Sequence, residues 1–440
     1  MSSDRLVRSL LRRQELSAVP TSDWFTTGRF GLFVHFGIYS GAARHEWVQT
    51  NERLSDEDYA QYVENFEPDL FDAAEIARTA KNAGMEYVVL TTKHHDGFAL
   101  WNTAQSDFNS VAACGRDLVA EFVAAMRAEG LRVGLYHSLI DWHHPDFTVD
   151  WNHPRRDDAN AAELNAGRDM ARYRAFLHAQ MRELLTDYGQ IDYLFFDFTY
   201  PETKQGWVGK SAEDWDAAGL LALCRELQPD VIVNDRLGIP GDFVTPEQYQ
   251  PTEPLVQDGE PVLWEACQTT NGSWGYDRDN DNHKSADLLI RMLADSVSMG
   301  GNMLLNIGPN GRGAVDPRDA RLLAEIGEWM RLHGRAITGA GHAPHTPPRV
   351  GVYTQNGDRL YLHLFSWPMG FVHLPDLAGR VRYARFLHDG SWIKMSVSDP
   401  EQQALVTQPA GQQAGTLTLA LPVRRPDVAM PVIELLLSED

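Results

Sequence analysis

Short apolar runs alternate with longer amphipathic stretches along residues 29–335 of this chain. The apolar runs are typical of buried strands, and the stretches between them repeat apolar residues at helical spacing. Alternating strands and helices favour a parallel sheet, and a long series of such units favours a barrel. Seven strands are predicted, at 29–36, 86–93, 131–138, 192–198, 230–236, 262–268 and 302–308. The pattern therefore predicts an α/β protein with a (β/α)8-like barrel of the TIM type, complete or one strand short.

Helices are predicted in the connections between these strands, for example at 72–84, 115–130 and 170–189. The first two segments end at Gly84 and Gly130, and glycine is the usual residue just after the last helical turn. These glycines support the predicted helix ends.

The period of the pattern changes after a Gly/Pro-rich stretch at 338–350. Strand-like runs at 349–365 flank the turn signal Asn356-Gly357-Asp358, and the same arrangement recurs around Asp389-Gly390. We therefore expect two domains: a β/α barrel over residues 1–340 and a small antiparallel β-sandwich over residues 346–440.

The composition, 43% hydrophobic and 23% charged, is typical of a globular protein. A net charge of −22 opposes binding to nucleic acid or to an anionic membrane surface. No apolar stretch reaches the roughly 18 residues of a membrane-spanning helix. We therefore expect neither nucleic acid nor a membrane as a partner.

The arginine-rich first 20 residues lack the apolar core of a secretory signal, and we expect a short amphipathic helix around Leu6, Leu10 and Leu11. The three cysteines, an odd number without CxxC spacing, favour a reducing compartment and thus a cytoplasmic protein.

Polar side chains recur at the predicted strand ends. In a barrel of this type the reactive groups lie at the C-terminal ends of the strands. Long connections after three of the strands bring further polar groups to the same rim. These residues are His35, His94, His95, His137, Asp197, Arg236, Glu265 and Asn306 on the strands, and Glu46, Trp47 and Glu247 on the connections.

The histidines allow more than one interpretation. His35 by itself is compatible with a core position. His94 and His95 are adjacent, so only one can point into the barrel unless the chain turns after the strand. A metal site with nearby carboxylates is an alternative, although neither HxH on a strand nor HExxH on a helix occurs.

Asp197 lies in an almost continuous apolar strand, where an unpaired carboxylate is costly. A structural ion pair with Arg236 is one explanation. Further acids at Glu46, Glu247 and Glu265, surrounded by Trp, His and Arg, instead describe a glycosidase, in which one carboxylate attacks and another protonates the leaving oxygen. The histidines would then bind sugar hydroxyls.

Several sequence motifs lie at the predicted strand ends and in the connections that follow them, at 24–40, 45–47, 91–101, 134–147, 234–236, 264–276 and 302–313. Taken together, these motifs resemble those of the α-L-fucosidases of glycoside hydrolase family 29. The resemblance implies a catalytic barrel followed by a β-sandwich, and no metal or organic cofactor. It also implies retaining hydrolysis of terminal α-L-fucose from fucosylated oligosaccharides or glycoconjugates through a covalent fucosyl-enzyme intermediate. Fucosidases of this type often form homo-oligomers, and the sandwich offers a contact surface.

The resemblance assigns the nucleophile to Asp197 and favours Glu247 as the acid/base, with Glu265 as the competitor. Many family members have a tryptophan two residues before the nucleophile and a glycine after it, where this chain has Phe195 and Phe198. The substrate contacts it implies, to which we add His137, are His35, Glu46, Trp47, His94, His95 and Arg236.

Two other functional classes remain as alternatives. A non-catalytic fucose-binding barrel would lack the nucleophile or the acid. A metal-dependent barrel hydrolase would use His94, His95, His137 and an acid, and would carry bound zinc.

Overall fold

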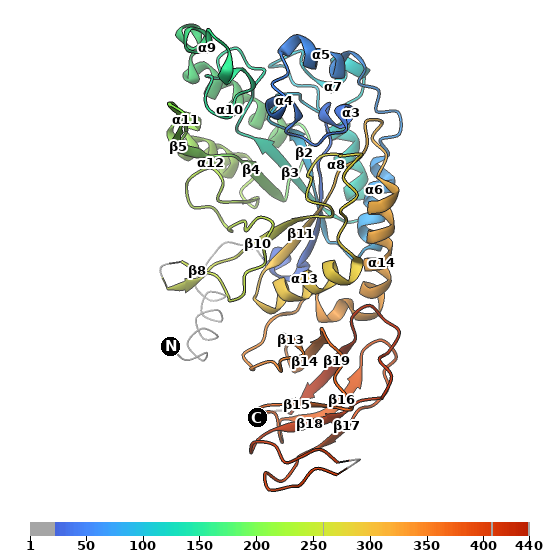
Figure 1. Ribbon diagram of the computed structural model, residues 1–440. Coiled ribbons are helices and arrows are strands. Elements are labelled where there is room, and N and C mark those ends of the chain that lie inside the picture. Colours follow the sequence, from blue (N-terminus) through green and yellow to red (C-terminus); the bar gives the residue numbers. More distant parts are fainter. Residues whose placement is uncertain (1–22, 258, 406–407, 439–440) are drawn as a thin grey trace.

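The computed structural model describes residues 23–257, 259–405 and 408–438 (Figure 1). The helix expected around Leu6, Leu10 and Leu11 lies outside these residues. The parallel β/α part and the antiparallel C-terminal part lie end to end in Figure 1. No helix in the described ranges is long and apolar enough to cross a membrane.

A curled sheet of seven parallel strands forms the centre of the larger part, which confirms the predicted fold class. Its order is β10-β11-β1-β2-β3-β4-β7, and each strand is almost entirely buried. The strands are β1 (Phe30–Val34), β2 (Tyr87–Lys93), β3 (Arg132–Ser138), β4 (Tyr193–Asp197), β7 (Ile232–Val233), β10 (Glu265–Thr269) and β11 (Asn302–Ile307).

An irregular segment, residues 242–248, lies between the two edge strands β7 and β10. Phe243 forms a parallel bridge with Asn234 after β7, while Val244 and Glu247 bridge to the chain around β10. The Gln248 amide also donates to the carbonyl of Cys267 at 2.9 Å. We expected a loop here, but the segment takes the place of the eighth strand. Sequence reasoning missed it because it carries no apolar run.

Helices cover much of the outer face of the sheet. The longer ones begin at side chains that accept a backbone N–H of the first turn, such as Asp72, Asp117 and Ser285. Gly84 and Gly130, just beyond α6 and α8, have positive φ angles, as their predicted position after a helix requires. The longer helices are α5 (Asp56–Glu64), α6 (Ala73–Asn82), α8 (Leu118–Ala128), α10 (Met170–Thr186), α12 (Ala217–Leu227), α13 (Ala286–Ser298) and α14 (Pro317–His333).

Shorter elements lie mostly in the connections. The antiparallel pair β5 (Tyr200–Lys204) and β6 (Trp207–Lys210) follows β4 as a hairpin, and β8 (Val256–Gln257) pairs with β9 (Glu260–Pro261). The short helices are α2 (Asp23–Gly28), α3 (Tyr39–Ala42), α4 (Val48–Asn51), α7 (Ser110–Cys114), η1 (Pro154–Asp157), α9 (Ala161–Leu164), η2 (Asn165–Gly167), α11 (Ala212–Trp215) and η3 (Gly334–Ala336).

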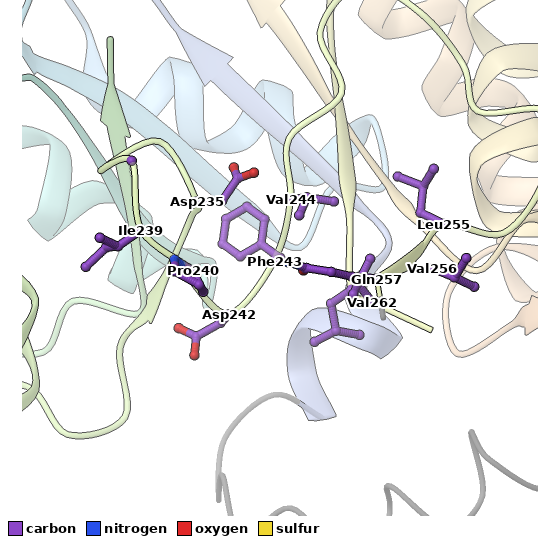
Figure 2. Close-up of a pocket in the computed structure, with 13 residues that line it drawn as sticks. Asp235, Ile239, Pro240, Asp242, Phe243, Val244, Leu255, Val256, Gln257 and Val262 are labelled. Carbon is purple, nitrogen blue, oxygen red and sulfur yellow. The ribbon is translucent and has the colours of Figure 1, made fainter. Parts of the chain in front are cut away.

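The flank around residues 242–248 lacks a covering helix among the described residues, because the connections on both sides of the segment are short or form only the β8–β9 pair. A pocket of about 630 Å³ opens there. Figure 2 shows the side chains that line it. Its lining includes Ile239, Phe243 and Val262, but none of the residues expected to bind substrate. This pocket is therefore separate from the strand ends that carry those residues.

The C-terminal part contains two antiparallel sheets with a core of their own, formed by residues such as Leu362, Leu419 and Ile433. One sheet has the order β12-β13-β14-β19-β16 and the other β15-β18-β17. The strands are β12 (Gly341–His342), β13 (Gly351–Asn356), β14 (Arg359–Leu364), β15 (Phe371–Leu374), β16 (Val381–Phe386), β17 (Lys394–Ser396), β18 (Leu417–Ala420) and β19 (Val432–Leu437).

Aromatic side chains fill the interior of the barrel. Phe25 of α2 packs on Phe243 and Tyr193 where the strands begin, and Phe33, Tyr136 and Phe195 pack on one another further along. Polar groups at the strand ends therefore rest on a packed apolar floor.

Candidate active site

Asp197 is the last residue of β4, and its carboxylate is held by two donors. Arg236 Nη1 donates to Oδ1 at 2.8 Å, and the Tyr136 hydroxyl donates to Oδ2 at 2.9 Å. His95 Nε2 lies 4.0 Å from the same Oδ2 atom. The side chain is only 12% exposed, so these partners satisfy a carboxylate that water reaches poorly.

Arg236 joins Asp197 to a second acid, since its Nη2 atom pairs with Glu247 Oε2 at 2.7 Å. Burial lowers the pKa of Arg236, but the charges of Asp197 and Glu247 raise it above its ordinary value. The guanidinium therefore stays charged. The Glu247 side chain is 41% exposed and lies on the irregular segment 242–248. One partly buried cation thus links a buried carboxylate and an accessible one.

His35 follows β1, and its protonation is fixed by Asn306 of β11. Asn306 donates from Nδ2 to the Trp274 carbonyl at 2.7 Å, which leaves its Oδ1 as an acceptor 2.6 Å from His35 Nδ1. Burial lowers the pKa of His35 to about 3. His35 is therefore neutral, carries its proton on Nδ1 and offers Nε2 as an acceptor.

His95 is held in the same way by Ser138 at the end of β3. The Ser138 hydroxyl donates to the Ile140 carbonyl at 2.8 Å and so accepts from His95 Nδ1 at 2.6 Å. Burial lowers the pKa of His95 to about 3. Its Nε2 atom, directed toward Asp197, is therefore an acceptor for a hydroxyl hydrogen.

Both His94 and His95 reach the interior because β2 ends at Lys93 and the chain then turns, with the Gly97 amide donating to the His94 carbonyl. Their ring centroids are 4.1 Å apart. His94 stacks on Tyr136 at 5.5 Å, and burial lowers its pKa well below the ordinary value. Its buried Nδ1 has no hydrogen-bond partner among the described residues.

Glu46 and Trp47 approach from the connection after β1. Glu46 Oε2 accepts the Gly275 amide hydrogen at 2.7 Å, and burial, with a contribution from the charge of Glu247, raises the pKa of Glu46 to about 7. A Cβ at position 275 would lie 3.1 Å from the Glu46 nitrogen, so the glycine permits this close approach. The Trp47 ring packs 4.7 Å from that of His95. Both expected residues therefore lie with the strand-end groups.

His137 lies elsewhere, contrary to our expectation. Neighbouring side chains on a strand point to opposite faces, and Tyr136 occupies the interior. His137 instead lies within 3.0 Å of the Thr92 hydroxyl and 5.8 Å from the Trp101 ring. Its side chain packs between the sheet and the surrounding elements.

Glu265 is also not near Asp197, so its candidacy as acid/base is wrong. It is the first residue of β10, and its carboxyl oxygens accept hydroxyls from Tyr87 and Tyr193, the first residues of β2 and β4. Its side chain therefore lies at the opposite end of the barrel, where burial raises its pKa to about 7.

Asn306 was predicted at the rim but without a role, and Tyr136, Trp274 and Ser138 were not predicted as site residues, although all four support the reactive groups. Strand alternation next to His137 could have pointed to Tyr136. The roles of Asn306, Trp274 and Ser138 depend on contacts between distant segments, which the sequence does not show. Within the described residues, no group of three or more His, Cys, Asp or Glu side chains is arranged to hold a metal ion.

Comparisons with known proteins identify the family of this chain. Residues 9–335 match the family model described as Alpha-L-fucosidase. The tissue α-L-fucosidase of Mus musculus is 30% identical over 431 residues, which cover 90% of this chain and 89% of that protein.

Solved structures that resemble this chain are also α-L-fucosidases. Isoenzyme 1 of α-L-fucosidase from Paenibacillus thiaminolyticus has a TM-score of 0.88 at 40% identity, covering 96% of this chain and 100% of its own. A Bacteroides thetaiotaomicron family 29 fucosidase, solved as a trapped covalent intermediate with 2-fluoro-fucosyl fluoride, has a TM-score of 0.79 at 26% identity and covers 96% of both chains. This chain therefore belongs to the α-L-fucosidases of glycoside hydrolase family 29 and is a glycoside hydrolase.

Proposed function

We propose that this protein is a retaining exo-α-L-fucosidase that releases terminal α-L-fucose from fucosylated oligosaccharides or glycoconjugates. The observation that carries the proposal is the pair of carboxylates, Asp197 and Glu247, joined through Arg236. A retaining glycosidase needs two carboxyl groups close together, one to attack and one to transfer a proton. The trapped covalent intermediate of the Bacteroides relative supports the same chemistry.

In the first step an Asp197 oxygen attacks the anomeric carbon, and the bond to the leaving oxygen breaks as Glu247 donates its proton to that oxygen. The product is a β-linked fucosyl ester on Asp197. In the second step Glu247 takes a proton from water, whose oxygen attacks the same carbon and releases Asp197. Two inversions leave α-L-fucose.

Asp197 fits the role of nucleophile because it is buried and its charge is held by Arg236 and Tyr136. Glu247 fits the role of acid/base because its greater exposure lets it meet both the leaving oxygen and water. The acceptor nitrogens of His35 and His95 suit sugar hydroxyls, and the Trp47 ring suits an apolar edge of the sugar.

The test is 4-nitrophenol release from 4-nitrophenyl α-L-fucoside by the wild type, Asp197→Ala and Glu247→Ala, each with and without azide. We expect wild-type turnover and large losses in both variants. Azide should rescue Asp197→Ala with β-fucosyl azide as product, by one inversion. Azide should also rescue Glu247→Ala, here with α-fucosyl azide as product, because two inversions then occur at the anomeric carbon. An active Asp197→Ala variant or exchanged azide products would contradict the assignments.

We also propose a reducing, cytoplasmic environment. Cys114, Cys224 and Cys267 are free thiols, which supports this location. Fractionation of the source cells would test it, and recovery of the activity only outside the cytoplasm would contradict it.

A further inference from the structure

Phe198, directly after the proposed nucleophile, has a backbone conformation that L-residues rarely adopt. Its φ is +86°, in the region that favours glycine. The surrounding chain enforces it: the Asp197 carbonyl accepts the Leu139 amide at 3.0 Å, and the Thr199 hydroxyl donates to the Arg236 carbonyl at 2.8 Å. Strain of this kind, held in place next to reactive groups, points to a functional role for the side chain.

The Phe198 ring is packed between the sugar site and the β5–β6 hairpin. Its centroid lies 5.2 Å from Trp47 and 5.1 Å from His95 on one side, and 5.2 Å from Tyr200 on the other. Tyr200 is itself anchored, because its hydroxyl donates to the buried carboxylate of Asp150 at 2.7 Å. The ring therefore has a fixed position.

The depth of Phe198 below the protein surface indicates which part of the substrate it contacts. The polar groups that suit fucose hydroxyls are deeply buried, with His35, His95 and Glu46 each 3% exposed or less. Phe198 is only partly buried, and most of the adjoining hairpin is exposed. A fucose ring held by the deep groups would place the sugar that carries it at the outer level, beside the Phe198 ring.

We propose that Phe198 is a specificity-determining residue that binds the leaving group: its ring packs against the apolar face of the sugar to which fucose is attached. This inference rests on the proposed function. Sugar rings have apolar faces formed by C–H groups, and an aromatic side chain offers a flat apolar surface at little cost in conformational entropy. The exposed hairpin next to it leaves room for the rest of a glycan.

The test compares two kinds of leaving group. α-L-Fucosyl fluoride releases fluoride, which has no apolar face, whereas a fucosylated disaccharide releases a sugar. The measured quantity is kcat/KM for the best-cleaved disaccharide of a linkage panel divided by kcat/KM for the fluoride. In Phe198→Gly this ratio should fall about tenfold. This factor corresponds to the loss of about 50 Å² of apolar surface that the ring and the sugar bury together in the wild type.

Two further measurements separate a contact from a structural effect. Phe198→Leu keeps the bulk and the Cβ atom but not the flat ring, so its ratio should fall about threefold. The inhibition constant of free L-fucose should stay within twofold in both variants, because fucose binds at the deeper level.

Each outcome has a distinct meaning. A wild type that hydrolyses neither the fluoride nor any disaccharide would overturn the proposed function itself. The wild type could hydrolyse the fluoride and a disaccharide while Phe198→Gly shows a disaccharide-to-fluoride ratio of kcat/KM within twofold of the wild-type ratio. In that case the proposed function stands and the proposed role of Phe198 is wrong. If the inhibition constant of L-fucose rises by the same factor by which the kcat/KM ratio falls, Phe198 contacts fucose itself. This result would overturn its assignment to the leaving group.

Discussion

Replacing Glu265 by glutamine should separate its structural role from catalysis. Its two carboxyl oxygens accept hydroxyls from Tyr87 and Tyr193, and the side chain is completely buried. Burial raises its pKa from 4.5 to about 7, although the two tyrosine hydroxyls oppose the rise. Below about pH 7 the folded state therefore holds the neutral acid, in which one of the two oxygens donates its proton instead of accepting one. A neutral acid has a hydroxyl donor at one oxygen and a carbonyl acceptor at the other, and the glutamine amide has an NH2 donor group and a carbonyl acceptor in the same two places, so Glu265→Gln imitates the protonated form.

The magnitude follows from the pKa difference. Between pH 4.5 and 7 the native state holds a proton on Glu265 that the unfolded state has released, so the stability falls as the pH rises through this window. A difference of roughly 2.5 pKa units corresponds to about 3 kcal/mol of unfolding free energy. Glutamine does not titrate, so the variant lacks this loss. Relative to the wild type it should be similarly stable at pH 4.5 and more stable, by up to about 3 kcal/mol, at pH 8.

Urea unfolding of both proteins from pH 4.5 to 8 measures this difference, and kcat/KM for 4-nitrophenyl α-L-fucoside measures the catalytic effect. Activity should stay within about threefold of the wild type, because Glu265 lies at the opposite end of the barrel from Asp197. Glu46 and Asp96, whose pKa values burial also raises to about 7, cancel in the comparison. A hundredfold loss of activity with an unchanged pH dependence of stability would refute the reasoning.

Three further outcomes test other parts of the site. Tyr136→Phe removes the hydroxyl that donates to Asp197 and should lower kcat/KM by about 10–100-fold, since a hydrogen bond to a charged group contributes about 1.5–3 kcal/mol; an effect below twofold in steady-state assays would contradict this. His137→Gln should leave kcat and the inhibition constant of L-fucose within about threefold, because His137 packs outside the sheet interior; loss of fucose binding in a folded variant would return His137 to the site. His35→Asn should lower kcat/KM equally at each pH from 5 to 8, because the pKa of His35 is already about 3 and the residue stays neutral; a changed profile would show that His35 titrates there.

The fold was predictable where the sequence pattern is local. Seven buried strands are visible as apolar runs, and the helix ends at Gly84 and Gly130 follow from glycine chemistry. Residues 242–248 were not recognised as the eighth strand, because Gly241 and Pro246 flank or interrupt a segment held mainly by bonds to its neighbours. A strand defined by tertiary contacts leaves little trace in its own sequence.

The site was predictable only as far as the strand boundaries were. Asp197 and Arg236 follow from the rule that reactive groups lie at the C-terminal strand ends. Glu265 was placed within a predicted strand at 262–268, but β10 begins at Glu265, which moves the side chain to the other end of the barrel. The prediction for His137 was wrong for another reason. Tyr136 and His137 are neighbours on one strand and point to opposite faces, and only the packing of the barrel interior decides which of the two faces the sugar site.

Arg236 connects the two halves of the proposed mechanism. Among the described residues it is the one arginine or lysine that forms ion pairs with both Asp197 and Glu247. While Asp197 is charged, the two carboxylates share this cation. Once Asp197 becomes a fucosyl ester it loses its negative charge, and the Coulomb attraction of Arg236 then acts on Glu247 alone. In the second step Glu247 therefore accepts a proton from water while it is paired with Arg236. A single, partly buried guanidinium can therefore support first the nucleophile and then the base.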